Sequence, residues 1–243
     1  MKAKKPRILF YDLETSPNIV TSWGLFVGGM LSPDSIISER TIICGSWKWQ
    51  GQRDVVSACV DARTPAADQS VVQLLCNAIR EADAVVAHNG DKFDMRWINA
   101  RAVFHGLPPL PPVIQIDTLK IAKAKFKFNS NKLAYLVEFL KVGKKIKTEF
   151  GLWKACMAGD VKALAKMVRY NRRDIVILER VYDKLAPYVP ARLNAQLFRA
   201  AGCPSCGASR VQSRGLAYTI AHAYKRFQCT KCGHWFRSRK AEK

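Results

Sequence analysis

The chain has 243 residues, enough for one sizeable α/β domain and a small appended module, and its 49% of hydrophobic residues exclude an intrinsically disordered protein. Lys and Arg total 40 against 19 Asp and Glu, which gives a formal net charge of +21. A field of this sign favours nucleic acid as a partner, although charge alone leaves adhesion to a membrane surface or a role in solubility open.

The first third of the chain predicts three antiparallel strands. Residues 7–13 form an apolar run that ends on acidic residues. Residues 40–49 and 54–60 are two further runs of strand-forming residues, separated by the turn sequence Gln50-Gly51-Gln52.

The middle of the chain predicts a βαβ unit. Residues 70–81 carry apolar side chains at helical spacing and lead to a short buried strand at residues 84–88. A second helix at residues 92–104 is followed by a proline-rich break and a strand at residues 113–117.

Helices follow at residues 119–124, 132–140 and about 161–185, where Pro187 and Pro190 end the last of them. Beyond Ala200 the sequence has few aliphatic residues and many Arg, Lys and aromatic residues. We therefore expect a domain boundary between Arg192 and Gly202, with an α/β domain over residues 1–195 and a small module over residues 200–243.

Acidic residues stand at the ends of several predicted elements. Asp12 and Glu14 alternate at the end of the first strand, so both point to one side. Asp94 lies in the first turns of a predicted helix, where the helix dipole favours negative charge. Tyr170 and Asp174 lie four apart on the last helix and share a face. Each feature alone is typical of ordinary strand ends, helix starts and core packing.

Taken in order, the segments Y-D-L-E-T-S-P, H-N-x-x-x-F-D and Y-x-x-x-D resemble the Exo I, Exo II and Exo III motifs of the DEDD (DnaQ-like) 3′–5′ exonucleases, which include the proofreading domains of family B DNA polymerases. The Asp117-Thr118-Leu119 triplet is also similar to a segment of that family. Tyr170 matches the DEDDy branch, because the position at which the DEDDh branch carries His is Arg169 here.

The resemblance covers residues 8–185 and implies an RNase H-like fold, a mixed β-sheet flanked by helices. The wider layout is also similar to phage-encoded exonucleases, with Trp23, Trp47-Lys48-Trp49 and Leu152-Trp153-Lys154 contributing. The basic start lacks the apolar core of a signal peptide, and no apolar run is long enough to span a membrane. We expect a cytoplasmic protein, in the host cytoplasm if it is phage-encoded.

The resemblance also implies the site and its chemistry. Asp12, Glu14, Asp94 and Asp174 would bind two Mg²⁺ or Mn²⁺ ions, with Asp12 bridging them and Asp94 supporting the second. Tyr170 would orient the attacking water. The expected products are 5′-nucleoside monophosphates released from a 3′ end. Asn89 is a weaker candidate, either for contacting the substrate backbone or for bracing the site.

Residues 120–147 carry nine lysines, one acidic residue (Glu138) and the aromatic side chains of Phe126, Phe128 and Tyr135. This mixture suits a grip on single-stranded nucleic acid through phosphate contacts and base stacking. It equally suits a solvated helical face whose aromatic rings belong to the core.

Two C-x-x-C pairs, Cys203/Cys206 and Cys229/Cys232, each followed by Gly, have the spacing of a zinc ribbon with four cysteine ligands. So small a module needs metal for stability, and we expect one structural Zn²⁺. Strands are predicted at residues 210–214, 224–228 and 235–239, and His222 and His234 as surface residues rather than ligands. Interleaved Arg, Lys and aromatic residues favour nucleic-acid binding by the ribbon, with protein docking as the alternative. The four other cysteines are expected to be buried thiols.

The sequence favours a DNA exonuclease over two alternatives. An RNase H-like site also supports a structure-specific endonuclease, and a third possibility is a nucleic-acid-binding protein without turnover. The choice between DNA and RNA, the preference for single or double strands, and any partner among replication or repair proteins stay open at this level.

Overall fold

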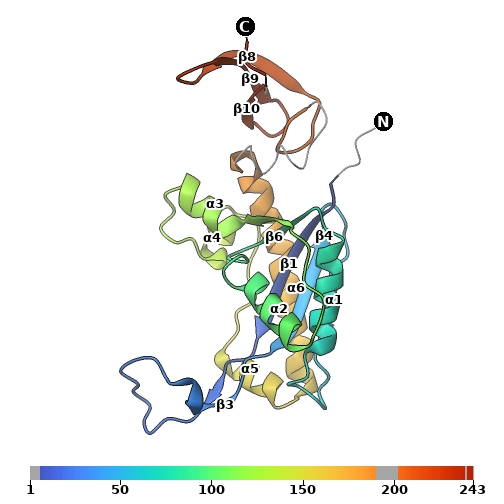
Figure 1. The fold of residues 1–243 in the computed structure, drawn as a ribbon, viewed down its shortest axis with the longest axis vertical. Helices are drawn as coiled ribbons and strands as arrows, with labels where there is room; N and C mark the ends of the chain where they lie inside the picture. The colour runs from blue at the N-terminus through green and yellow to red at the C-terminus, as the bar shows by residue number, and fades with distance from the viewer. Residues whose placement is uncertain (1–5, 190–201, 239, 243) are drawn as a thin grey trace.

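The computed structural model describes residues 6–189, 202–238 and 240–242. A mixed α/β body carries a small β-ribbon beyond the C-terminal end of its longest helix, and an arm of the chain projects from the opposite end (Figure 1). The predicted domain boundary between Arg192 and Gly202 falls almost entirely on residues 190–201, which lie outside the described residues.

A five-stranded mixed sheet forms the centre of the body, in the order β5-β4-β1-β6-β7. β1 pairs antiparallel with β4 and parallel with β6, so it occupies the middle of the sheet (Figure 1). β4 pairs antiparallel with β5, and β6 parallel with β7. The strands are β1 (Ile8–Thr15), β4 (Ile42–Trp49), β5 (Val56–Cys59), β6 (Ala84–Ala87) and β7 (Ile114–Asp117).

Six α-helices of the described chain surround this sheet or extend from it. They are α1 (Gln69–Arg80), α2 (Asp94–Phe104), α3 (Thr118–Lys125), α4 (Leu133–Phe139), α5 (Phe150–Met157) and α6 (Val161–Leu185). The arm contains a short pair of strands, β2 (Ile19–Val20) and β3 (Ile36–Ser38), and the 3-10 turn η1 (Pro33–Ser35). A second 3-10 turn, η2 (Ala186–Tyr188), follows α6.

The alternation of side chains along β1 decides which face each residue serves. Leu9, Tyr11 and Leu13 join the core formed with α1 and α2. Ile8 and Phe10 join the core formed with α6 on the other face. Because every second residue shares a face, Asp12 and Glu14 continue the row that faces α6.

Helix α6 packs along this face because one of its sides is apolar over most of its length. Met167, Ile175, Leu178 and Val181 are among its fully buried side chains. Asp160 caps the start of the helix by accepting hydrogen bonds from the backbone N–H groups of Lys162 and Ala163, at 2.7 and 3.0 Å. The cap sets the first residue of α6, and the buried apolar side holds its 25 residues against the sheet.

The predicted mixed sheet flanked by helices is confirmed, including the antiparallel start and the central βαβ unit β6-α2-β7. Boundaries in the body differ from the predicted ones by one or two residues. Helix α5 and the β2–β3 arm were not predicted. Helix α5 is short and contains Gly151, while the arm lacks the alternation that marks a half-buried strand.

The ribbon is a three-stranded sheet in the order β10-β9-β8, with antiparallel neighbours. Its strands are β8 (Val211–Tyr218), β9 (Ala223–Cys229) and β10 (Trp235–Arg237), so the three strands predicted here are present, the first of them longer than expected. The ribbon contacts the body where the Ser205 hydroxyl donates a hydrogen bond of 2.7 Å to the backbone oxygen of Ala186.

Among the described residues, no helix is long and apolar enough to cross a membrane.

A buried ionic cluster joins α1, α2 and β4. The Asp68 carboxylate is fully buried and accepts two hydrogen bonds of 2.7 Å from the Arg101 guanidinium. It also contacts His105 Nε2 at 2.7 Å and accepts from the Ile42 backbone N–H at 2.8 Å. These partners keep the pKa of Asp68 below its usual value although burial opposes this.

Asp68 is fully buried, so solvent cannot take the place of a lost hydrogen-bond partner. We therefore predict that Arg101→Met lowers the free energy of unfolding by about 3–5 kcal/mol. Chemical denaturation measures the effect. Arg63→Met is the matched control, because Arg63 pairs with Asp61 on the exposed surface and its loss should cost less than about 1 kcal/mol. Equal costs for the two variants would contradict a structural role for the buried cluster.

Candidate active site

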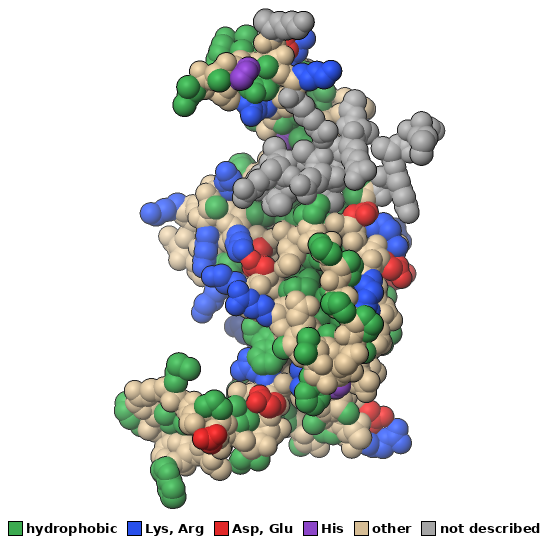
Figure 2. Space-filling view, viewed as in Figure 1, with side chains coloured by type: hydrophobic (Ala, Val, Ile, Leu, Met, Phe, Trp, Pro, Cys, Tyr) green, Lys and Arg blue, Asp and Glu red, His purple; other side chains and the backbone are tan. Residues whose placement is uncertain are grey.

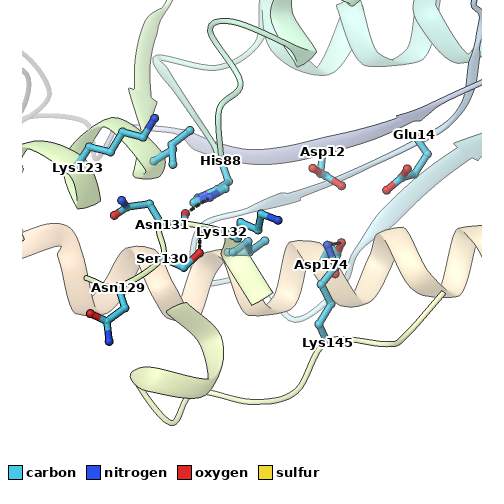
Figure 3. Close-up of a pocket in the computed structure, with 12 residues that line it drawn as sticks. Asp12, Glu14, His88, Lys123, Asn129, Ser130, Asn131, Lys132, Lys145 and Asp174 are labelled. Atoms are coloured by element: carbon cyan, nitrogen blue, oxygen red, sulfur yellow. Dashed lines mark hydrogen bonds and ion pairs between the residues drawn. The ribbon is translucent and has the colours of Figure 1, made fainter. Parts of the chain in front are cut away.

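Three carboxylates from two elements meet where β1 crosses α6. Asp12 and Glu14 on β1 and Asp174 on α6 each offer one oxygen, and these oxygens lie within 4.8 Å of one another. Figure 3 shows the side chains of Asp12 and Glu14 approaching Asp174 from the strand above the helix. The alternation of β1 and the packing of α6 are the causes of this convergence.

Asp94 lies beside this group but outside the set of three. It is buried at the first residue of α2, and its Oδ1 accepts a hydrogen bond of 3.2 Å from the Leu13 backbone N–H. It is near enough to Asp12 for its charge to raise the pKa of Asp12. The four predicted carboxylates are therefore neighbours, with Asp94 reaching β1 from the start of α2.

The turn before α2 explains the sequence Asn89-Gly90. Asn89 has a φ of 70°, a left-handed conformation that Asn tolerates better than most residues, and its backbone N–H donates a 2.9 Å hydrogen bond to Asp117 Oδ1. A Cβ atom on Gly90 would lie 2.3 Å from the Cβ of Ala87. The turn therefore needs these residue types, and the observed contact of Asn89 is one that braces the loop.

Tyr170 lies one turn before Asp174 on α6 and is held by two neighbours. The Trp153 ring of α5 packs edge-on against it, with ring centroids 6.2 Å apart. Lys145 Nζ lies 5.0 Å from the centroid of the Tyr170 ring and pairs with Asp174 Oδ2 at 2.7 Å. The sequence marked Lys145 only as one of the nine lysines of residues 120–147, because the segment that carries it has no periodic pattern.

Asn171 is a second neighbour that the motif did not predict. It is fully buried on α6, and its Nδ2 donates a 2.6 Å hydrogen bond to Asp12 Oδ2. Its place within the Tyr170–Asp174 segment, three residues before Asp174, is the only signal that the sequence offered. The amide therefore fixes one oxygen of Asp12.

Burial and mutual repulsion raise the pKa values of these acids. Burial is the largest cause for Asp12, followed by the charges of Asp94, Glu14 and Asp174. Burial, then the charge of Asp174, raises the pKa of Glu14 to about 8, and burial raises the pKa of Asp94 to about 7. Lys145 offsets part of this by favouring the ionised forms of Asp12, Glu14 and Asp174.

These donors fit hard divalent cations. Asp174 Oδ1 is buried without a hydrogen-bond partner among the described residues, as expected of an oxygen that a cation would satisfy. Carboxylate oxygens are the ligands that Mg²⁺ and Mn²⁺ prefer. The Lys145 ammonium already pairs with Asp174 at this place, so the three carboxylates attract positive charge as a cation site would.

A cleft of about 590 Å³ opens over the carboxylates. Asp12, Glu14 and Asp174 line one end, and the residues around Asn129–Leu133 line the other (Figure 3). Lys123, Lys132 and Lys145 also line it, which makes the cleft attractive to a phosphate chain. His88 stands in its wall between Thr118 Oγ1 and the Asn131 backbone oxygen, and burial lowers its pKa to about 4, so it is neutral at pH 7.

Residues 120–147 were expected either to grip a nucleic-acid strand or to form a solvated face over the core. The aromatic residues fit the second interpretation, and some of the lysines fit the first. Phe126, Phe128 and Tyr135 pack against the core beside α6, and the first two rings stack with centroids 4.9 Å apart. Those rings therefore belong to the core, as the second interpretation expected. Three of the nine lysines, in contrast, reach the cleft.

The four paired cysteines form a compact cluster. Cys203, Cys206, Cys229 and Cys232 each offer a sulfur within 4.8 Å of the others. The Cys203–Cys232 and Cys206–Cys229 sulfur distances are 3.6 and 3.7 Å. Four thiolates around a tetrahedral zinc ion lie about 3.8 Å apart, whereas a disulfide requires about 2.05 Å. The cluster fits a tetrahedral metal ion and is consistent with a zinc ribbon.

The prediction for the two ribbon histidines was half right. His222 is exposed, as expected. His234 is not a surface residue: it is 5% exposed, and its Nδ1 contacts the Pro187 backbone oxygen at the end of the body. The small ribbon buries this side chain because it packs against η2.

Comparison with known proteins gives three findings. Residues 37–186 match the family described as the RNase H superfamily. The chain is 31% identical over 121 residues to "DNA polymerase III PolC-type" of Ureaplasma parvum serovar 3 (strain ATCC 700970), covering 49% of this chain and 8% of that protein. It is similar in fold to the family B DNA polymerase of Pyrobaculum calidifontis, with a TM-score of 0.55 at 14% identity, over 91% of this chain and 32% of that one.

The matched family segment includes Asp94, Tyr170 and Asp174 but begins after Asp12 and Glu14. The convergence of Asp12 and Glu14 with Asp174 is therefore an observation on the structure of this chain itself. Since the chain spans only 8% and 32% of these two relatives, their polymerase names describe proteins that are much longer than it.

The raised pKa values predict how stability depends on pH without metal. The folded chain holds protons on Glu14 and Asp94 that the unfolded chain releases near pH 4, so the free energy of unfolding should fall as pH rises from about 4 to about 8. The slope is at most about 1.4 kcal/mol per pH unit for each group. Thermal unfolding in chelator across this range measures it, and Mn²⁺ should restore stability at the alkaline end.

Glu14→Gln with Asp94→Asn should flatten this slope, while Asp34→Asn on the exposed arm should not. The raised pKa values would be contradicted if the double variant lost stability with pH as steeply as the unaltered chain.

Removal of one cluster sulfur tests the metal in the ribbon. Cys206→Ser should lower the bound zinc from about one ion per chain to none, because three thiolates hold the ion far more weakly than four. Elemental analysis of the purified protein measures the zinc. Cys59→Ser, which removes a half-buried thiol of the body, is the control and should keep it. Equal zinc content in both variants would rule out the four-cysteine site.

Proposed function

The chain belongs to the RNase H superfamily, and from this we propose that it is a two-metal-ion nuclease of the DEDDy type that releases 5′-nucleoside monophosphates from the 3′ end of DNA. The observation that carries the proposal is the meeting of the Asp12, Glu14 and Asp174 oxygens within 4.8 Å, one helical turn from Tyr170. Three carboxylates this close together repel one another, and a bound cation would remove that repulsion.

Each side chain has a task in this proposal. Asp12, Glu14 and Asp174 would hold one divalent cation, and Asp94 would help Asp12 to hold a second. Two divalent cations, when bound, supply the charge that activates a water and stabilises the leaving oxygen. Asn171 keeps Asp12 oriented through its 2.6 Å hydrogen bond.

Tyr170 positions the attacking water rather than removing its proton. Burial and the charge of Asp174 raise the pKa of Tyr170 further above its usual value, so the hydroxyl stays protonated at neutral pH. A protonated phenol is a fixed donor and acceptor but a poor base. Lys145, which contacts both Tyr170 and Asp174, keeps the pair in place before metal binds.

Nucleic acid as substrate is supported by charge and by the cleft. The chain carries +21, and Lys123 and Lys132 line the cleft beside the carboxylates. The choice of a 3′–5′ exonuclease acting on DNA rests on the resemblance of the three motifs and on the relatives, both of which are named as DNA polymerases. The additional resemblance to phage-encoded exonucleases supports the cytoplasm of a host cell as the compartment of the proposed activity.

The ribbon is proposed to bind the same nucleic acid. The Arg237 guanidinium lies 3.9 Å from the centroid of the Tyr224 ring, and that of Arg226 lies 5.3 Å from the centroid of Trp235. Such pairs present positive charge and flat rings together on one sheet, which suits contacts with phosphates and bases. Tyr218 and Trp235 remain exposed beside them.

Digestion of DNA and RNA oligomers labelled at the 5′ end tests the function. With Mg²⁺ or Mn²⁺ we expect a ladder that shortens from the 3′ end, and with chelator no cleavage. Asp12→Ala should lower the rate by at least about a thousandfold, because it removes the ligand shared by both cations. Asp54→Ala is the matched control and should leave the rate unchanged, since Asp54 is exposed between β4 and β5 and lines neither the cleft nor the arm.

A circular single strand separates the two nuclease types. An exonuclease leaves the circle intact, so linearisation would identify an endonuclease instead. Undiminished metal-dependent cleavage by Asp12→Ala would contradict both nuclease types, and the absence of any cleavage would favour a protein that only binds nucleic acid.

A further inference from the structure

An arm of the chain leaves the body directly after the carboxylates. It comprises residues 16–38 and begins two residues beyond Glu14. The Ser16 backbone N–H donates to the Thr41 oxygen at 2.9 Å, and further out Thr21 pairs with Ser35 at 2.8 Å. β2 and β3 form the neck, and the loop beyond them projects away from the sheet (Figure 1).

The arm exposes apolar side chains to an unusual degree. Every residue from Asn18 to Asp34 is exposed. Trp23, Leu25, Phe26 and Met30 are at least 93% exposed, so their packing contributes nothing to the stability of the body. Several large apolar side chains exposed on one short segment mark a place where another molecule binds.

The near absence of charge on the arm indicates which part of a nucleic acid it could contact. Its one charged side chain is Asp34, in a chain that carries 40 Lys and Arg. With no cation of its own, the arm offers phosphates no ionic contact, and such contacts supply most nucleic-acid affinity elsewhere. Flat rings and aliphatic side chains instead suit the faces of bases, which stack on aromatic residues regardless of sequence.

The position of the arm points to the strand that enters the proposed active site. Trp23 is nine positions beyond Glu14 in the chain, so it lies at most about 30 Å from the carboxylates, a length of about nine stacked nucleotides. Figure 2 shows the molecule hollowed between the arm, at lower left, and a surface rich in Lys and Arg above it. A strand in this hollow would have basic side chains on one side and the arm on the other.

We propose that the arm is a base-binding element: Trp23 and Phe26 stack on unpaired bases within about nine nucleotides of the 3′ end that lies at Asp12, Glu14 and Asp174. The proposal rests on the proposed function and adds a contact surface for unpaired bases that lies outside the carboxylate site. The lysines of the cleft hold the phosphates, and the arm holds the bases. Because the cleft lysines contact the phosphates and the arm contacts the bases, the arm needs no Lys or Arg of its own.

The experiment compares two double variants of the full chain. Trp23→Ser with Phe26→Ser removes both rings, while Trp23→Phe with Phe26→Tyr keeps a ring at each position. Because these side chains are exposed, neither change should alter the melting temperature. Binding to a single strand of about 20 nucleotides is measured by fluorescence anisotropy in chelator, and KM and kcat are then measured with Mg²⁺.

We expect the Ser variant to bind the strand about tenfold or more weakly and to raise KM by a similar factor, and the ring-retaining variant to behave like the unaltered chain. The p-nitrophenyl ester of thymidine 5′-monophosphate, too short to reach the arm, should be hydrolysed equally by all three. Replacing the bases near the 3′ end with abasic sites should weaken binding by the unaltered chain but not by the Ser variant. Val103→Ser, at an exposed apolar residue of α2, is the control and should change nothing.

Three results would overturn the inference: unchanged binding by the Ser variant, equal loss in the ring-retaining variant, or equal sensitivity of both chains to abasic sites. Conversion of a dimer to a monomer by the Ser variant in size-exclusion chromatography would also overturn it, by assigning the arm to a second copy of the chain. Failure of the proposed nuclease function would appear separately, as no hydrolysis of ester or strand, because the anisotropy measurement needs no cleavage.

Discussion

The repulsion among buried carboxylates at the crossing of β1 and α6 is the constraint on which the rest of the structure depends. Asp12, Glu14 and Asp174 face one another at one end of the cleft, and the nearby charge of Asp94 adds to the repulsion. Burial raises the pKa values of Asp12, Glu14 and Asp174, and the charges of neighbouring carboxylates raise those of Asp12 and Glu14 further. Without metal, the Lys145 ammonium offsets part of this cost.

The surrounding fold has the rigidity needed to hold these groups together. β1 lies in the middle of the sheet, with partners on both edges, and α6 is tied to the sheet by its buried apolar face. The Lys48–Glu179 ion pair joins β4 to α6 one turn beyond Asp174. A shift of either element would separate the carboxylates, so the packing of the core serves the site directly.

Local patterns in the sequence predict which of the candidate site residues share a face, whereas their meeting at one place was implied by the resemblance of the three motifs. The alternation of β1 predicts that Asp12 and Glu14 share a face, and the spacing of α6 predicts the same for Tyr170 and Asp174. Lys145 could not be found in this way: it lies in an irregular segment whose path depends on tertiary contacts. The apolar arm was missed for a related reason, since its side chains have no core to face and so show no period.

A manganese-soaked crystal, read by anomalous scattering, tests the central claim most directly. The account predicts two peaks about 3.5–4 Å apart, with Asp12 between them and Lys145 displaced from Asp174. A map without anomalous density at this place, and with the ammonium of Lys145 still paired to Asp174, would contradict it.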